Sequence, residues 1–338
     1  MTYLSLGKLP PELLNEIIQN SPVLDKRVIV GPKIGMDCSI IDNGDSYLVL
    51  KNDPITFTPE NIGWYAVQIN VNDIVTTGAT PKWMLATVLL PENITTKEMV
   101  KTISSQLFSA CREKNISFIG GHTEITHGIN RPIISATLIG EVEKNNLITP
   151  GGVQIGDDIL LTKGIAIEAT AILANDFESF LKNSLLQEEI IEAKNYIYDP
   201  GISVYKDSII AIQSGGIHAM HDPTEGGLSS ALWEMAIVSD KSFLFYEDKV
   251  MCSNLSRKIC AHFEMDPINS ISSGALLMTV DPNFSQNIIT ELKNNGIECS
   301  IIGTIISEGA NVEIENYKGR NILIRPDRDD ITNVYNLK

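Results

Sequence analysis

Short apolar runs alternate with longer segments of helical periodicity over the first 150 residues. Runs such as YLVL and WMLATVLL are typical of buried strands, because nearly every position is apolar and the run is too short for a helix. Other segments repeat apolar residues three or four positions apart, as an amphipathic helix does. Thr58-Pro59-Glu60 supplies a cap and a first-turn proline for one of them. The pattern predicts strands at 47–50, 83–90, 116–121 and 132–142, and helices at 61–79 and 95–114.

The second half repeats this alternation after a break in the pattern. Asn145-Asn146 and Pro150-Gly151-Gly152 are clusters of turn formers. We therefore expect two domains, residues 1–152 and 153–338, each an α+β unit in which a purely parallel sheet is not demanded. The expected strands are 158–162, 218–220, 272–280 and 300–304, the last followed by a polar tail. The expected helices are 167–175, 187–195, 201–213, 226–239 and 283–295.

Composition excludes several classes of protein. The chain has a formal net charge of −16, so it lacks the basic face that binding to nucleic acid requires. No apolar run approaches the ~18 residues of a membrane span, and the start of the chain does not have the pattern of a secretion signal. Five scattered cysteines form no C-x-x-C pair, which argues against a zinc site or a disulfide framework. We expect a cytoplasmic protein without nucleic-acid or membrane partners.

The predicted helix 61–79 contains polar residues that its apolar surroundings do not explain. Asn70 and Asp73 stand three residues apart and so project from one face of a helix that is apolar on most sides. One interpretation is a hydrogen-bonded polar stripe. The other is a cation site, because Asp37 and Asp53 also adjoin apolar strands and Mg²⁺ takes oxygen ligands from separate elements.

Two glycine-containing segments are candidates for binding a ligand. Gly120-Gly121-His122-Thr123-Glu124 follows a predicted strand, although a strand-ending turn explains its glycines equally well. The segment 221–228, HDPTEGGL, precedes a predicted helix, whose N-terminal amides can bind phosphate without a basic residue. An ordinary Asp-Pro turn is the alternative. The chain contains no Walker A sequence.

Together, VNDIVTTGATP, GGHTE and HDPTEGGL resemble segments of the aminoimidazole ribonucleotide (AIR) synthetase superfamily, in the same order and over nearly the whole chain. This superfamily includes purine synthetases, thiamine-monophosphate kinase, selenophosphate synthetase and the hydrogenase maturation protein HypE. The nearest resemblance is to HypE and the AIR synthase-related proteins. It implies a PurM-like α+β fold of two domains, in which the N-terminal domain forms a β-barrel across a homodimer.

The resemblance also implies site residues and cofactors, namely ATP and Mg²⁺. Carried over by motif, the implied metal ligands are Asp37, Asp53 and Asp73. The implied catalytic residues are Asp73, His122 and Asp222. The implied nucleotide-binding residues are Lys51, Asn70, Gly120, Gly121, Thr224, Gly226 and Gly227.

Four departures from the family pattern limit what can be carried over. HypE ends in a cysteine that carries the carbamoyl group, whereas this chain ends ITNVYNLK. Glu225 stands where relatives have Arg or Lys, and His122 where they have Asp or Glu. The early Gly-Asp-Asp pattern is reduced to Gly35-Met36-Asp37. A missing phosphate contact could come from Lys33, Lys51 or Lys163.

The resemblance implies an enzyme that uses ATP to phosphorylate an amide-type or similar oxygen, which then becomes a leaving group. The acceptor, a small molecule or a protein, is not readable from the sequence. Two alternatives stay open: a HypE-like hydrogenase maturation factor that acts with a partner, and a catalytically silent nucleotide-binding factor.

Overall fold

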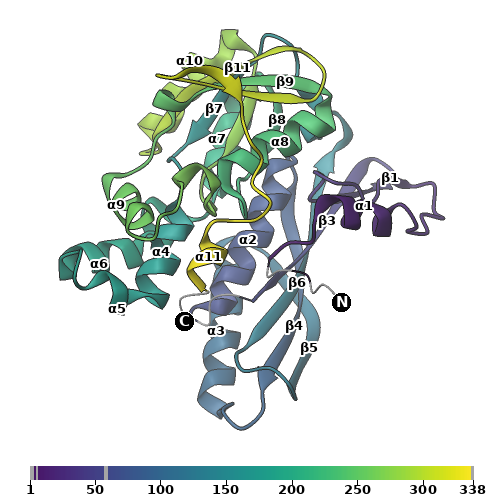
Figure 1. Ribbon diagram of the computed structural model, residues 1–338. Coiled ribbons are helices and arrows are strands. Elements are labelled where there is room, and N and C mark those ends of the chain that lie inside the picture. Colours follow the sequence, from purple (N-terminus) through teal and green to yellow (C-terminus); the bar gives the residue numbers. More distant parts are fainter. Residues whose placement is uncertain (1–3, 5–6, 57–59, 336–338) are drawn as a thin grey trace. The chain divides into compact units, whose positions relative to one another are not determined.

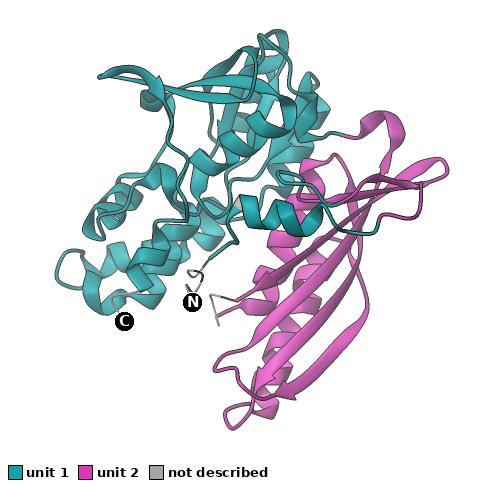
Figure 2. Cartoon of the chain, turned by 45° about the vertical axis from the view of Figure 1, so that its right-hand side comes forward, with its two compact units in different colours: residues 1–22, 32–36, 148–338 teal, residues 23–31, 37–147 magenta. Residues whose placement is uncertain are grey.

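The chain divides into two compact units (Figure 2). The computed structural model describes residue 4 and residues 7–56 and 60–335. Unit 1 comprises Met1–Pro22, Pro32–Met36 and Ile148–Lys338, and unit 2 comprises Val23–Gly31 and Asp37–Leu147. This division differs from the expected boundary after residue 152, because residues 1–22 and 32–36 group with the C-terminal half. Gly35, for example, lies against the backbone of Glu234, where an added Cβ would be 3.1 Å from the carbonyl oxygen.

Unit 2 contains a six-stranded sheet of order β1-β2-β3-β6-β4-β5. Its strands are β1 (Val28–Val30), β2 (Ser39–Asn43), β3 (Ser46–Ile55), β4 (Thr80–Pro91), β5 (Ser117–Thr126) and β6 (Ile133–Glu143). Among these described strands only β4 and β5 pair in parallel. A parallel pair requires a crossover, which the helix between them provides.

Two helices, α2 (Ile62–Thr76) and α3 (Lys97–Glu113), accompany this sheet. They lie on one side of it (Figure 2). Glycine allows close packing at Gly63, where a Cβ would lie 2.5 Å from the Ile103 carbonyl oxygen of α3. Both predicted helices are confirmed in type; Thr96 caps α3 by accepting the Met99 amide at 3.1 Å. Thr58 and Pro59, expected to start α2, lie outside the described residues.

Unit 1 contains a seven-stranded sheet of order β13-β12-β9-β11-β7-β10-β8. Its strands are β7 (Asp158–Thr162), β8 (Ile217–His221), β9 (Lys241–Tyr246), β10 (Leu277–Val280), β11 (Cys299–Glu308), β12 (Asn311–Asn316) and β13 (Gly319–Ile322). Of the described pairings, β12 with β9 is the parallel one and the others are antiparallel. Both units are therefore mixed α+β structures, as expected.

The helices of unit 1 are labelled in Figure 1. They are α1 (Pro11–Ile18), α4 (Ile167–Asp176), α5 (Glu178–Leu181), α6 (Gln187–Asn195), α7 (Tyr205–Ser214), α8 (Gly227–Ser239), α9 (Asn254–His262), α10 (Pro282–Asn294) and α11 (Ile331–Tyr335). Helix α8 buries Leu228, Leu232 and Met235 in one core with residues of the sheet. No helix among the described residues has the length and apolar character to cross a membrane.

Three expectations about secondary structure are wrong. The tail after residue 304 is not simply polar: β12, β13 and α11 follow, because β12 gains its hydrogen bonds from β9. The strand expected at 272–280 begins only at Leu277, since the Ser272 hydroxyl bonds the backbone of a loop. The segment Gly120–Glu124 is not a turn after a strand but lies inside β5. Gly121 pairs with Ala86 so closely that a Cβ would lie 1.9 Å from the Ala86 carbonyl oxygen.

Candidate functional site

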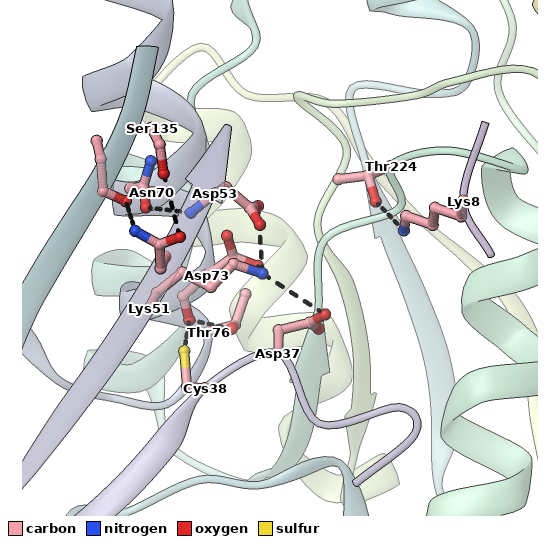
Figure 3. Close-up of polar contacts among 12 residues, drawn as sticks. Lys8, Asp37, Cys38, Lys51, Asp53, Asn70, Asp73, Thr76, Ser135 and Thr224 are labelled. Atoms are coloured by element: carbon pink, nitrogen blue, oxygen red, sulfur yellow. Dashed lines mark hydrogen bonds and ion pairs between the residues drawn. The ribbon is translucent and has the colours of Figure 1, made fainter. Parts of the chain in front are cut away.

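Three aspartates of unit 2 surround one lysine ammonium group (Figure 3). Lys51 and Asp53 lie two residues apart on β3 and therefore point to the same face of the strand. Asp73 comes from α2, and Asp37 lies two residues before the start of β2. The Lys51 Nζ atom lies 3.2 Å from carboxylate oxygens of both Asp53 and Asp73 and 3.8 Å from one of Asp37. We call these four residues the carboxylate–lysine cluster.

Solvent exposure differs within the cluster, from a buried interior to a partly exposed edge. Asp73 exposes only 5% of its side chain and Lys51 10%, whereas Asp37 and Asp53 each expose 33%. Burial alone disfavours the Lys51 ammonium, but the carboxylates of Asp73, Asp37 and Asp53 outweigh it and raise the pKa of Lys51 well above its usual value. Lys51 is therefore a permanent cation inside the cluster.

Buried polar groups hold the carboxylates in place. The Asn70 side chain donates to the Ala66 carbonyl at 2.8 Å and accepts the backbone amide of Asp53 at 3.2 Å, which ties α2 to β3. The backbone carbonyl of Asp73 accepts from the Thr76 hydroxyl at 2.7 Å and from the Cys38 thiol at 3.5 Å. Asn70 is thus a positioning residue for Asp53, and Cys38 has the structural role expected of a buried thiol.

The donor set of the cluster fits a hard divalent cation. Three carboxylates face a single ammonium, so negative charge remains in excess. Mg²⁺ is normally held by one or two carboxylates together with waters and phosphate oxygens, which matches the half-open edge formed by Asp37 and Asp53. The Lys51 side chain would have to move aside or share the site.

Gly120, Gly121 and His122 do not join this cluster within unit 2. All three lie on β5, which is separated from β3 by β6 and β4. Three strand spacings correspond to about 14 Å. His122 is exposed, and its Nε2 atom lies 3.2 Å from a carboxylate oxygen of Glu124 on the same strand.

In unit 1, the segment His221–Gly227 joins β8 to α8, as the sequence predicts. His221 is buried, and its Nε2 atom lies 2.9 Å from a carboxylate oxygen of Glu234. The other oxygen of Glu234 accepts from the Arg325 guanidinium at 3.1 Å. Asp222, the next residue, is also buried. We call the segment 221–227 the glycine turn.

The two glycines of this turn are required by its backbone. Gly226 has φ +81° and Gly227 φ +60°, and a Cβ on Gly227 would lie 2.5 Å from the Ile268 carbonyl oxygen. The Gly226 amide donates to a carboxylate oxygen of Asp329 at 2.7 Å. The Gly226 amide, expected from the sequence to bind phosphate, is therefore already hydrogen-bonded to the Asp329 carboxylate.

Acidic groups gather near the glycine turn. Burial raises the pKa of Glu168, in the first turn of α4, to about 7; the nearby Ser273 hydroxyl opposes the rise, and the charges of Asp329, Glu225 and Asp222 add to it. Burial likewise raises the pKa of Asp329 to about 7, although the Ile331 and Gly226 amides oppose it. Both carboxyl groups can therefore exchange a proton near neutral pH.

Some of these residues were missed by the sequence analysis. Glu168 could have been found from the sequence, because it interrupts the apolar run IAIEATAIL. A carboxylate within an apolar helix is the same kind of signal that identified Asp73 on α2. Arg325 and Asp329 gave no signal, because each reaches its partner across about ninety or more residues of sequence. A cation does approach the turn: Lys8 donates to the Thr224 hydroxyl at 3.4 Å. Lys163 instead donates to the Ser203 carbonyl at 2.7 Å and lies 3.2 Å from Asp207.

The chain is similar to known proteins over almost its whole length. It is 30% identical to a putative hydrogenase expression/formation protein of Methanocaldococcus jannaschii, covering 97% of both chains. It is 25% identical to the carbamoyl dehydratase HypE of Bradyrhizobium diazoefficiens, covering 81% of this chain and 79% of that one.

Solved structures have the same fold. A HypE–HypF complex matches with a TM-score of 0.75 at 20% identity, covering 93% of this chain and 99% of the other. A HypE structure in complex with ATP matches with a TM-score of 0.71 at 20% identity, covering 93% and 90%. Residues 35–142 match the model of the N-terminal domain of AIR synthase related proteins, and residues 154–315 that of their C-terminal domain. The chain therefore belongs to the AIR synthase-related family.

Proposed function

We propose that this protein is an ATP- and Mg²⁺-dependent enzyme that transfers the terminal phosphoryl group of ATP to an amide-type oxygen. The new C–O–P linkage makes that oxygen a leaving group, and ADP is released. The carboxylate–lysine cluster carries the proposal, because it gathers the oxygen ligands and the single cation that phosphoryl transfer requires. The relatives support it: one is a carbamoyl dehydratase, and a HypE structure holds ATP.

The residues of the cluster would bind the metal ion or supply positive charge, and Asn70 would position a carboxylate. Asp37, Asp53 and Asp73 would hold Mg²⁺, which when bound offsets the charge of the phosphate oxygens. Lys51 supplies a permanent positive charge, and its flexible side chain can contact the phosphate groups. Asn70 holds the backbone of Asp53 and so keeps its carboxylate at the partly exposed edge.

We extend the proposal to the remaining expected site residues. Thr224, Gly226 and Gly227 would contact phosphate through the hydroxyl and amides of the glycine turn. Asp329 must then give up the Gly226 amide. Asp222 would contribute a further carboxylate. Gly120, Gly121 and His122 would act from the exposed strand β5.

The substitution Asp73→Asn tests the enzymatic assignment. We expect it to lower ADP release from Mg-ATP, measured alone and with a panel of primary amides as acceptors, by about 100-fold or more, because one charged ligand is lost at nearly constant shape. Asp42→Asn is the matched control, since Asp42 lies on β2 of the same sheet and pairs with Lys144, just after β6, outside the cluster. Equal ADP release by wild type and Asp73→Asn would contradict the assignment of this protein as an ATP-dependent enzyme. It would favour the alternative of a catalytically silent nucleotide-binding factor.

We further propose a homodimer. β5 is an edge strand of the unit 2 sheet, and its Ile119 and Ile125 expose 54% and 62% of their surface. An exposed edge with apolar side chains invites pairing. Light scattering should give twice the 37.1 kDa of one chain, and Ile125→Lys should shift the mass toward one chain. A wild-type mass of one chain at micromolar concentration would rule out the dimer.

A second candidate is a hydrogenase maturation factor that works with a partner protein. The similarity over 97% of the chain to a putative hydrogenase expression/formation protein favours it, and a HypE–HypF complex has the same fold. This reading is compatible with ATP-dependent chemistry, because the acceptor could be a group carried by the partner. A binding assay with a purified carbamoyltransferase-type protein tests it, and absence of any association would count against it.

A further inference from the structure

Unit 1 contains a cavity of about 290 Å³ that none of the site residues discussed so far lines, apart from Lys163. Three segments form it: the loop after β7, the end of α6 with the turn that follows, and the start of α9. Its polar lining residues include Lys163, Glu192, Tyr196, Asp199, Ser253 and Ser256. Pockets of roughly this size or larger, with a few convergent polar groups, are typical of small-molecule sites.

A chain of hydroxyl groups runs inward from the cavity wall. Tyr196 lies 3.0 Å from the Ser253 hydroxyl, Ser253 3.0 Å from Ser256, and Ser256 2.7 Å from Thr170. Thr170 ends the chain at the Ala166 carbonyl, 2.6 Å away. A carbonyl only accepts and each hydroxyl has a single proton, so every member donates inward. The Tyr196 oxygen at the outer end is therefore left as an acceptor, polarised by the bonds behind it.

The charges around the cavity favour a cation. Glu192 and Asp199 are exposed carboxylates at its rim. Burial raises the pKa of Tyr196; the hydrogen bond with Ser253 opposes the rise, and the charges of Glu192 and Asp199, which line the same cavity, add to it. The Lys163 ammonium is 3.2 Å from an oxygen of Asp207, which neutralises it. The cavity thus offers hydrogen-bond acceptors and negative charge, and it would repel phosphate.

We propose that this cavity binds a small organic cation with at least two N–H donors, such as an aliphatic diamine or an alkyl guanidinium. One cationic end lies between Glu192 and Asp199, and another N–H donates to the Tyr196 oxygen. The methylene groups contact Ile165 and Ile167, which also line the cavity. This inference does not rest on the proposed ATP chemistry, because it uses different residues and the opposite ligand charge.

Titration calorimetry with 1,4-diaminobutane tests the proposal, with 1,4-butanediol as the neutral probe of the same length. We expect saturable diamine binding with Kd below about 1 mM and no binding of the diol. Glu192→Gln should weaken diamine binding about tenfold, and Tyr196→Phe several-fold. Glu188→Gln, an exposed carboxylate on the same helix that does not line the cavity, should change nothing.

Three outcomes would overturn the inference: no saturable diamine binding to the wild-type protein, equal binding of the diol, or unchanged binding after Glu192→Gln. Glu192 is exposed, so its substitution does not threaten folding. A melting curve of each variant confirms this. Loss of diamine binding with Mg-ATP binding intact separates the cavity from the proposed catalytic site.

Discussion

Replacing Lys51 by methionine is expected to destabilise unit 2 by about 3–5 kcal/mol, the cost of removing one partner from a buried ion pair. The carboxylates of Asp37, Asp53 and Asp73 would then face one another without a cation. Methionine keeps most of the volume of the lysine stem, so the loss reports the charge. Urea unfolding in EDTA measures the effect.

The stability of Lys51→Met should depend on Mg²⁺. A divalent cation supplies the charge that Lys51 provided, so millimolar Mg²⁺ should recover much of the lost stability in Lys51→Met and change the wild type little. Lys144→Met is the control: it breaks a surface pair with Asp42, so it should cost much less stability than Lys51→Met and should show no response to Mg²⁺. If Lys51→Met lost stability but Mg²⁺ restored none of it, the cluster would be a structural ion network and not a metal site.

Replacing Glu168 by glutamine is expected to stabilise the protein, relative to wild type, more at pH 8 than at pH 4.5. The pKa of Glu168 is raised from 4.5 to about 7 by burial, so the folded state holds its proton more tightly than the unfolded state. The contribution is fully present below pH 4.5 and is lost as the pH rises to about 7. A difference of this size corresponds to about 3 kcal/mol.

Glutamine does not ionise, so the advantage of Glu168→Gln over wild type should grow by about 3 kcal/mol between pH 4.5 and pH 8. Urea midpoints at four pH values across this range measure it. Glu188→Gln is the control, because Glu188 is exposed and should leave the pH profile unchanged. A constant difference between Glu168→Gln and wild type across the range would show that the carboxyl group titrates normally.

The sequence predicted those parts of the fold that local patterns determine. The strand Asp158–Thr162 and the helix Gln187–Asn195 have the predicted bounds. Gly156 and Gly164 flank the apolar strand, and the helix buries Ile190 and Ala193, three residues apart, on one side. The strand Lys241–Tyr246 was missed although its sequence is KSFLFY. The short strands β12 and β13 depend on pairing with residues elsewhere in the chain, which no local pattern records.

The candidate site was predictable in the same uneven way. Asp73 was identified because a carboxylate in an apolar helix is costly to bury without a partner. The identity of that partner followed only from the structure, since Lys51 lies on another element. Its spacing from Asp53 on one strand was the available signal. The contact between Asp329 and Gly226 joins residues too far apart in sequence for any motif to reveal.

Calorimetric titration of the purified protein with a non-hydrolysable Mg-ATP analogue measures whether the carboxylate–lysine cluster binds Mg-ATP. We predict binding with a dissociation constant in the micromolar range, which corresponds to a binding free energy of about −8 kcal/mol. This binding should be lost in EDTA and in Asp53→Asn and retained in Asp42→Asn. Titrating at two temperatures prevents a vanishing enthalpy from hiding the binding. Binding of the same strength in EDTA, or no binding at either temperature, would contradict the assignment of the carboxylate–lysine cluster as a Mg-ATP site.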